Sequence, residues 1–309
     1  MSVARAGHVR AHFLRRHKET WASIGLFVLA WGVVRLWSVP VAVGTAVAAA
    51  HDTFALLPAL AALVGALLIQ VGTNLANDYF DFKNGADDEH RLGPTRVTQA
   101  GLISEGAVRA AMLATFALAA LVGVYLVGVG GWPILVIGIL SILSGIAYTG
   151  GPFPLGYNGL GDLFVFVFFG IVAVCGTYWV QAGVWSWDAF IASLPVGLLS
   201  TAILVVNNYR DMETDRKVGK NTLAVRFGAR AARAQYVSLV ALAFMVPVAQ
   251  VIVGGPVGLL ASLLALPLAV VVVRRFLRLR GAELNAVLAA TAGVLMVFGL
   301  LYSIGWLTA

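Results

Sequence analysis

The chain has 309 residues, of which 60% are hydrophobic and 11% are charged. An ordinary soluble domain has about 25% charged residues, so this chain has too few polar side chains to cover a water-soluble globule. The composition therefore excludes a soluble enzyme or soluble binding domain and indicates a polytopic membrane protein. The net charge of +7 follows from the membrane topology described below and does not indicate a nucleic-acid partner.

Nine apolar windows approach or exceed the roughly 20 residues that a membrane-spanning helix needs. In chain order they are 22–48, 54–76, 107–127, 131–148, 162–181, 188–208, 233–253, 256–273 and 284–306. Their apolar runs are continuous rather than alternating, which favours helices over strands. We therefore expect one all-α membrane domain, residues 1–309, with a bundle of nine transmembrane helices and a basic N-terminal segment at 1–20.

The basic residues predict the orientation of this bundle, because Lys and Arg accumulate on the cytoplasmic side of membrane helices. All of the 21 Lys and Arg residues except Arg35 fall in or beside the alternate segments that become cytoplasmic if the N-terminus is inside. The outer loops contain none. We expect a multi-pass protein of the cell membrane, in contact with its lipid, with the N-terminus cytoplasmic and the C-terminus outside.

Acidic residues gather at two helix ends on the predicted cytoplasmic side. Asp78, Asp81, Asp87, Asp88 and Glu89 follow the second window, and Asp211, Glu213 and Asp215 follow the sixth. The second and sixth windows cross the membrane in the same direction. Both clusters are therefore expected at the same membrane face.

Spacing indicates which of these side chains act together, because residues four apart share one face of a helix. This groups Asn74 with Asp78 and Asn77 with Asp81 in the first cluster. In the second cluster it groups Asn207, Asp211 and Asp215. Asp87 falls outside the first stripe, and we expect Gly85 to end the helix and let the chain turn Asp87 back.

Several carboxylates at one face repel one another unless a cation neutralises them. Magnesium is the expected cation, because it prefers oxygen ligands and typically takes one or two carboxylates together with substrate phosphates. Zinc is disfavoured, since the five histidines show no ligand spacing near these acids. The alternative is that the acids are solvated helix ends paired with nearby Lys and Arg. A magnesium site at the membrane face points to a substrate with a diphosphate head and a hydrocarbon tail.

Four ordered stretches carry a resemblance to a known family: NDYFDFKNGAD (77–87), GPTRVTQAGLIS (93–104), AYTGGPFPLGYNGLGDLFVFVFFG (147–170) and NNYRDMETDRKVGKNTLAVRFG (207–228). The sequence resembles the UbiA-type superfamily of intramembrane prenyltransferases from about residue 35 onward. Within it, the sequence is most similar to the MenA branch, the 1,4-dihydroxy-2-naphthoate polyprenyltransferases of menaquinone synthesis. Many members space the first three acids evenly, whereas here the third is displaced past Gly85.

The resemblance implies two magnesium motifs that coincide with the two stripes. Asn77, Asp81 and Asp87 match the first, Asn207, Asp211 and Asp215 match the second, and Asn74 and Asp78 are additional candidate ligands. Asp81, Asp87, Asp211 and Asp215 are the catalytic candidates, because the magnesium ions that they hold stabilise the leaving diphosphate.

Basic and aromatic residues complete the predicted site. Arg96, Lys220 and Arg210 are candidate donors to the diphosphate, and Lys83 and Arg226 are weaker ones. Tyr148, Tyr157 and Asp162 are candidates for contact with the allylic cation or the aromatic acceptor. For the tyrosines, an interfacial aromatic belt is the alternative, and for Asp162 it is a role at the start of the fifth helix.

The resemblance implies transfer of a polyprenyl group from a polyprenyl diphosphate to 1,4-dihydroxy-2-naphthoate with loss of carbon dioxide. 4-Hydroxybenzoate and homogentisate remain open as acceptors, because no motif reads the naphthoate. An ion-coupled transporter is disfavoured, since such sites lie near the bilayer midplane and the middle parts of the nine windows contain no Asp or Glu. A non-catalytic membrane scaffold would not need two matched Asn/Asp stripes.

Overall fold

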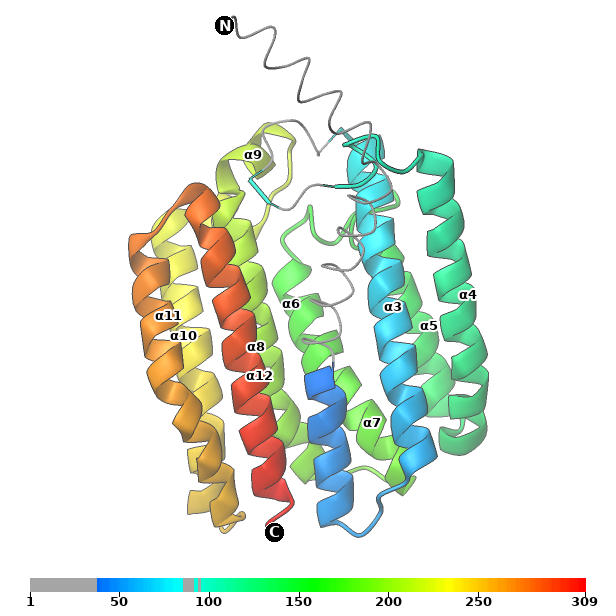
Figure 1. The fold of residues 1–309 in the computed structure, drawn as a ribbon, viewed down its shortest axis with the longest axis vertical. Coiled ribbons are helices and arrows are strands. Elements are labelled where there is room, and N and C mark those ends of the chain that lie inside the picture. Colours follow the sequence, from blue (N-terminus) through cyan, green and yellow to red (C-terminus); the bar gives the residue numbers. More distant parts are fainter. Residues whose placement is uncertain (1–37, 86–91, 94–95) are drawn as a thin grey trace, which may run out of the picture.

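The computed structural model describes residues 38–85, 92–93 and 96–309, and all regular structure within these ranges is helical (Figure 1). A short apolar helix, Ser38–Ala50, comes first. It is followed by α3 (Leu56–Lys83), α4 (Glu105–Gly130), α5 (Trp132–Ala147), α6 (Gly161–Val165), η1 (Phe166–Val172), α7 (Ala173–Ala182), α8 (Trp187–Arg210), α9 (Met212–Lys217), α10 (Leu223–Ile252), η2 (Val257–Ala265), α11 (Leu266–Arg278), η3 (Gly281–Glu283) and α12 (Leu284–Trp306).

The predicted all-α membrane bundle is confirmed. Seven helical stretches of the described ranges are long and apolar enough to cross a membrane, and Ser38–Ala50 and α5 are shorter apolar helices. Each of the nine predicted windows overlaps one of these nine stretches. The window 22–48 is described only from residue 38, so its first part and the basic segment 1–20 lie outside the described residues.

Two of the predicted windows are not uniform α-helices. The fifth consists of α6, the π-helical segment η1 and α7, and the eighth begins with the 3-10 segment η2 before α11. The π-helical segment lies against α8 at two glycines, since a Cβ on Gly170 would come within 2.7 Å of the Cα of Gly197. These two glycines allow close helix packing, whereas the change of helix type depends on tertiary packing, which the apolar windows do not predict.

Helix α8 lies at the centre of the bundle. Its buried positions, including Leu199 and Val206, join those of α10 and α12, such as Tyr236 and Phe298, in the main hydrophobic core. By contrast, α4 keeps large apolar side chains exposed, with Leu121 at 67%. Such exposure on a helix of this length is the expected pattern for a surface that faces lipid.

The fold brings the ends of α3 and α8 to one end of the bundle, the upper end in Figure 1. The short α9 continues from α8 at this end, and the loop between α5 and α6 lies there as well. The described acids of the two predicted clusters lie at these helix ends: Asp78 and Asp81 in the last turns of α3, Asp211 at the α8–α9 junction, and Glu213 and Asp215 in α9. These acids therefore lie at the same end of the bundle, as the directions of the two helices predict.

Candidate active site

The first Asn/Asp stripe occupies the last turns of α3. The helix continues to Lys83, Asn84 is its C-cap, and Gly85 has a positive φ of 66°. Glycine adopts this left-handed conformation without the steric cost that other residues meet. The predicted helix stop at Gly85 is confirmed, but the predicted return of Asp87 lies outside the described residues.

The second stripe continues across a break between two helices. Asp211 separates α8 from α9, yet its backbone N–H still donates to Asn207 O at 3.1 Å. The N–H of Asp215 then donates to Asp211 O at 2.8 Å. Because both bonds keep the i to i+4 helical pattern, Asn207, Asp211 and Asp215 stay in helical register, as their spacing predicts.

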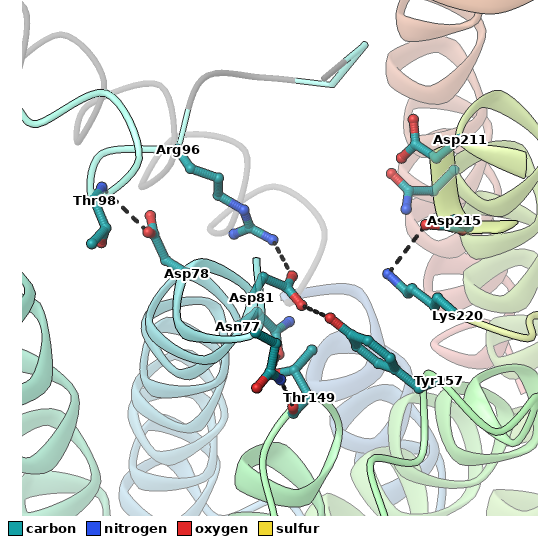
Figure 2. A network of polar contacts seen from close by, with 12 residues as sticks. Asn77, Asp78, Asp81, Arg96, Thr98, Thr149, Tyr157, Asp211, Asp215 and Lys220 are labelled. Carbon is teal, nitrogen blue, oxygen red and sulfur yellow. Dashed lines mark hydrogen bonds and ion pairs between the residues drawn. The ribbon is translucent and has the colours of Figure 1, made fainter. Parts of the chain in front are cut away.

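Two side chains connect the stripes (Figure 2). The phenolic O–H of Tyr157 donates to Asp81 Oδ1 at 2.9 Å. The ammonium of Lys220 lies 5.4 Å from the centre of the Tyr157 ring, within cation–π range, and 3.7 Å from Asp215 Oδ1. A chain of contacts therefore runs from Asp81 on α3 to Asp215 on α9.

Each of three carboxylates in the stripes has a basic partner. Arg96 Nη2 is 3.5 Å from Asp81 Oδ2, Arg210 Nη2 is 2.5 Å from Asp211 Oδ2, and Lys220 pairs with Asp215 as described. Asp81 and Asp215 are only 4% and 7% exposed. Since a buried charge without a partner is strongly destabilising, these three pairs allow the acids to lie close together.

The two asparagines of the first stripe also make hydrogen bonds, one to a neighbouring segment and one within α3. Asn77 Oδ1 accepts a hydrogen bond from Thr149 Oγ1 at 3.0 Å, and Asn74 Nδ2 donates back to Gln70 O within its own helix. These contacts leave the carboxamide of Asn77 beside Asp81 at the end of the bundle, as Figure 2 shows.

Asp78 holds the segment that carries Arg96. Its Oδ2 accepts from the backbone N–H of Val97 at 3.1 Å, and its Oδ1 accepts from that of Thr98 at 3.3 Å. Both carboxylate oxygens are thus bound to one backbone turn. This contact fixes the residue next to Arg96, and the spacing within the stripe contained no signal for it.

Arg210 is turned into the bundle and is 4% exposed. Its guanidinium donates to Asn207 Oδ1 at 2.7 Å as well as to Asp211. It also donates to Asn285 Oδ1 at 2.7 Å, and Asn285 Nδ2 donates to Leu92 O at 2.8 Å. Asn285 is a site residue that sequence reasoning missed, because it lies in another helix, α12, far along the chain.

The aromatic candidates line the loop between α5 and α6. Burial, followed by the nearby Asp81 carboxylate, raises the pKa of Tyr157 above its ordinary value, so its phenol is neutral at physiological pH. Tyr148 packs against the start of α6, where a Cβ on Gly161 would lie 2.8 Å from its hydroxyl oxygen. Asp162, in the first turn of α6, accepts a hydrogen bond from Gln235 Nε2 at 3.0 Å.

The donor set of this site fits magnesium chemically. Its oxygens come from carboxylates and carboxamides, which are the ligands that magnesium prefers. Within the described ranges, which leave out Asp87, no three His, Cys, Asp or Glu side chains converge as a metal site on their own.

Residues 36–292 match the UbiA prenyltransferase family. The chain belongs to this family. The family match agrees with the resemblance inferred from the sequence motifs. In this UbiA-family protein, the two Asn/Asp stripes lie at one end of a multi-pass helical membrane bundle. Membership of a prenyltransferase family argues against both alternatives, the ion-coupled transporter and the non-catalytic scaffold.

Two bacterial relatives within the family are similar to this chain over most of its length. The chain is 42% identical over 203 residues to the 1,4-dihydroxy-2-naphthoate octaprenyltransferase of Escherichia coli, an alignment that covers 64% of this chain and 66% of the relative. It is 34% identical over 273 residues to the enzyme of the same name from Bacillus subtilis, covering 87% of each chain.

A solved structure shares the fold. The structure of a UbiA homolog from Archaeoglobus fulgidus bound to DMAPP and Mg2+ matches with a TM-score of 0.61 at 14% identity. The match covers 91% of this chain and 99% of that one. The helical arrangement of the UbiA-family protein is therefore that of a known family fold.

Proposed function

We propose that this protein transfers a polyprenyl group from a polyprenyl diphosphate to 1,4-dihydroxy-2-naphthoate, with release of diphosphate and carbon dioxide. The product is demethylmenaquinol, a precursor of menaquinone. The observation that carries the proposal is the pair of facing Asn/Asp stripes, joined through Tyr157 and Lys220 at one end of a lipid-facing bundle. Such an end can take a charged diphosphate while the hydrocarbon chain lies among apolar helices.

The proposed acceptor is supported by the relatives. Both bacterial relatives described above are named for prenyl transfer to 1,4-dihydroxy-2-naphthoate, and the Bacillus subtilis alignment covers 87% of each chain. The Escherichia coli alignment spans only 66% of that relative, so the acceptor enters here as a proposal. 4-Hydroxybenzoate and homogentisate are the acceptors against which it is tested.

Magnesium is the proposed cofactor, held by residues of both stripes. We assign Asp81, Asp211 and Asp215 as ligands together with the carboxamides of Asn77 and Asn207, and Asp87 joins this set by its sequence match. When bound, magnesium supplies positive charge that stabilises the leaving diphosphate. The Mg2+-bound state of the Archaeoglobus fulgidus homolog supports this cofactor.

The basic residues have two different roles in this proposal. Arg96 and Lys220 donate to the phosphate oxygens. In the structure they form ion pairs with Asp81 and Asp215, and a bound diphosphate would accept hydrogen bonds from the same two side chains. Arg210 orients Asn207 and Asp211 from its buried position. Asp78 holds the turn beside Arg96.

The reaction begins when the allylic carbon–oxygen bond breaks and its electron pair leaves with the diphosphate. The ring carbon that bears the carboxylate attacks the allylic cation, and a carbon–carbon bond forms. The bond to the carboxylate then breaks, its electron pair returns to the ring and carbon dioxide leaves. Tyr148 and Tyr157 shield the cation from water with their ring faces, and Asp162 follows this loop in the first turn of α6.

The site is proposed to face the cytoplasm. The exposed basic residues of α9, Arg216 and Lys217, lie at the end of the bundle that carries the stripes. This agrees with the accumulation of Lys and Arg on cytoplasmic surfaces. We propose that residues 1–309 act as one prenyltransferase domain in the cell membrane, with 1–20 as a basic cytoplasmic segment and the C-terminus outside.

The release of carbon dioxide provides a direct test. Reconstituted protein is supplied with polyprenyl diphosphate, magnesium and 1,4-dihydroxy-2-naphthoate whose carboxyl carbon is isotopically labelled. Labelled carbon dioxide is expected only when all three are present. If prenylated product forms and keeps the label, the proposed site of attack on the ring is wrong.

A further inference from the structure

Two loops at the site are bound to each other through their backbones. The first, which we call the Tyr157 loop, is residues 149–160 between α5 and α6, and the second, the Lys220 loop, is residues 218–222 between α9 and α10. The backbone N–H of Asn221 donates to Tyr157 O at 2.8 Å. The two loops therefore meet at the residues that bear, or adjoin, the side chains connecting the stripes.

Arg226 makes hydrogen bonds to both loops where they meet. It lies in the first turn of α10, after the N-cap Thr222. Its Nε donates to Asn221 O at 3.0 Å, and its Nη2 donates to Asn158 O at 2.9 Å. One guanidinium thus binds a backbone carbonyl of each loop. The planar fork of arginine can make both bonds at once, whereas the single ammonium of lysine lacks this geometry.

Gly159 allows the guanidinium to approach the Tyr157 loop. It has a φ of 74°, a left-handed conformation that favours glycine. A Cβ at this position would lie 3.1 Å from Asn221 O and 3.2 Å from Arg226 Cζ. Any side chain at position 159 would press against the Arg226 guanidinium or Asn221 O. A glycine here therefore allows Arg226 to bind both loops.

We infer that Arg226 is a positioning residue, which sets the Tyr157–Lys220 pair between the two stripes and does not itself bind the diphosphate. In sequence, Tyr157 adjoins one of the two residues that Arg226 binds, and Lys220 adjoins the other. Fixing the two carbonyls therefore fixes the distance between the Tyr157 ring and the Lys220 ammonium. This inference rests on the proposed function and replaces the weaker expectation that Arg226 donates to phosphate.

The test compares Arg226→Lys and Arg226→Met with Arg230→Met, which removes another exposed arginine of α10. Steady-state kinetics give kcat and KM for both substrates, and thermal unfolding in detergent reports folding. Both Arg226 variants are expected to lower kcat/KM for the polyprenyl diphosphate roughly tenfold, the scale of losing one or two hydrogen bonds. The KM for the acceptor and the behaviour of Arg230→Met should stay at wild-type values.

The charge of residue 226 separates positioning from direct binding. Arg226→Lys keeps the positive charge but loses the fork, so a wild-type kcat/KM in this variant would overturn the inference. If Arg226→Met does not fold, Arg226→Lys carries the test by itself, and Gly159→Ala is a second variant that should lower kcat/KM by a similar factor.

A mutant cycle asks whether Arg226 acts through its neighbours. Binding of farnesyl thiolodiphosphate, an analogue that ionises poorly, is titrated in the wild type and in a Tyr157→Phe/Lys220→Met background. The effect of Arg226→Met on affinity should shrink to less than about twofold in that background, and an undiminished effect would indicate direct contact and overturn the inference. An inactive wild type would count against the proposed function, while this titration would still test Arg226.

Discussion

Tyr157 donates its phenolic O–H to Asp81 at 2.9 Å while its ring lies 5.4 Å from the Lys220 ammonium. A residue of a loop thus joins the first acidic stripe to the basic partner of the second. The geometry explains how two helix ends that are far apart in sequence form one site. It also makes Tyr157 the side chain whose removal tests the connection most simply.

Removing the Tyr157 hydroxyl should lower the catalytic efficiency without unfolding the protein. In Tyr157→Phe the ring and its contact with Lys220 remain, but Asp81 loses one hydrogen bond. We expect kcat/KM for the polyprenyl diphosphate to fall by about three- to tenfold, measured by steady-state kinetics. Tyr125→Phe, on the surface of α4, is the matched control and should behave as wild type. A wild-type Tyr157→Phe enzyme would contradict a role for the Asp81 bond.

The acids of the stripes should be far more sensitive than acids beside them. Asp81→Asn and Asp215→Asn each remove one negative charge from the proposed metal ligands and break an ion pair, with Arg96 and Lys220 respectively. We expect activity to fall by roughly 100-fold or more in each. Glu213→Gln removes a charge from the same short helix, α9, but at an exposed position, and should stay within about twofold. Similar losses in all three variants would argue against a specific ligand set.

Asp78 should differ from Asp81 in its response to magnesium. Asp78 accepts from the Val97 and Thr98 backbone, so Asp78→Asn should disturb the segment that carries Arg96. We expect a higher KM for the diphosphate, by about tenfold, with an unchanged half-saturating magnesium concentration. Asp81→Asn should raise that magnesium concentration. The titration of activity with magnesium distinguishes them, and a shift in Asp78→Asn as large as in Asp81→Asn would make Asp78 a ligand.

The protonation of Tyr157 gives a prediction for alkaline pH. Burial raises the pKa of this phenol in the folded protein, so the folded state holds the proton more tightly than the unfolded chain, whose tyrosines titrate at about pH 10. The corresponding contribution to stability is present below about pH 10 and is lost as the pH rises through the folded pKa. Thermal unfolding should therefore show less alkaline destabilisation in Tyr157→Phe than in the wild type. Identical alkaline limbs would show that the phenol is not held in this way.

Much of the site is predictable because the residues concerned lie close together in the sequence. The spacing of Asn207, Asp211 and Asp215 identifies one helical stripe, and the hydrogen bonds across the α8–α9 junction preserve that register. Gly85 marks the end of α3 through its own backbone preference. Such features depend on residues a few positions apart, so the sequence contains the information directly.

Contacts between distant segments could not be read in the same way. The bond between Asp78 and the Val97 backbone depends on how a loop docks, and the bond between Arg210 and Asn285 joins residues 75 positions apart. Arg226 is one basic residue among many in the sequence, and only the positions of two carbonyls show what it holds. The π-helical segment η1 likewise depends on close packing against α8.

The central claim is tested most directly by mass spectrometry of the product made by purified, lipid-reconstituted protein. The protein is given a polyprenyl diphosphate with 1,4-dihydroxy-2-naphthoate, 4-hydroxybenzoate or homogentisate, each with and without magnesium. We predict a magnesium-dependent prenylated naphthoquinol that lacks the carboxylate. Prenylation of one of the other two acceptors in place of the naphthoate would contradict the proposed acceptor, and no product from any acceptor in a folded preparation would contradict the proposed activity.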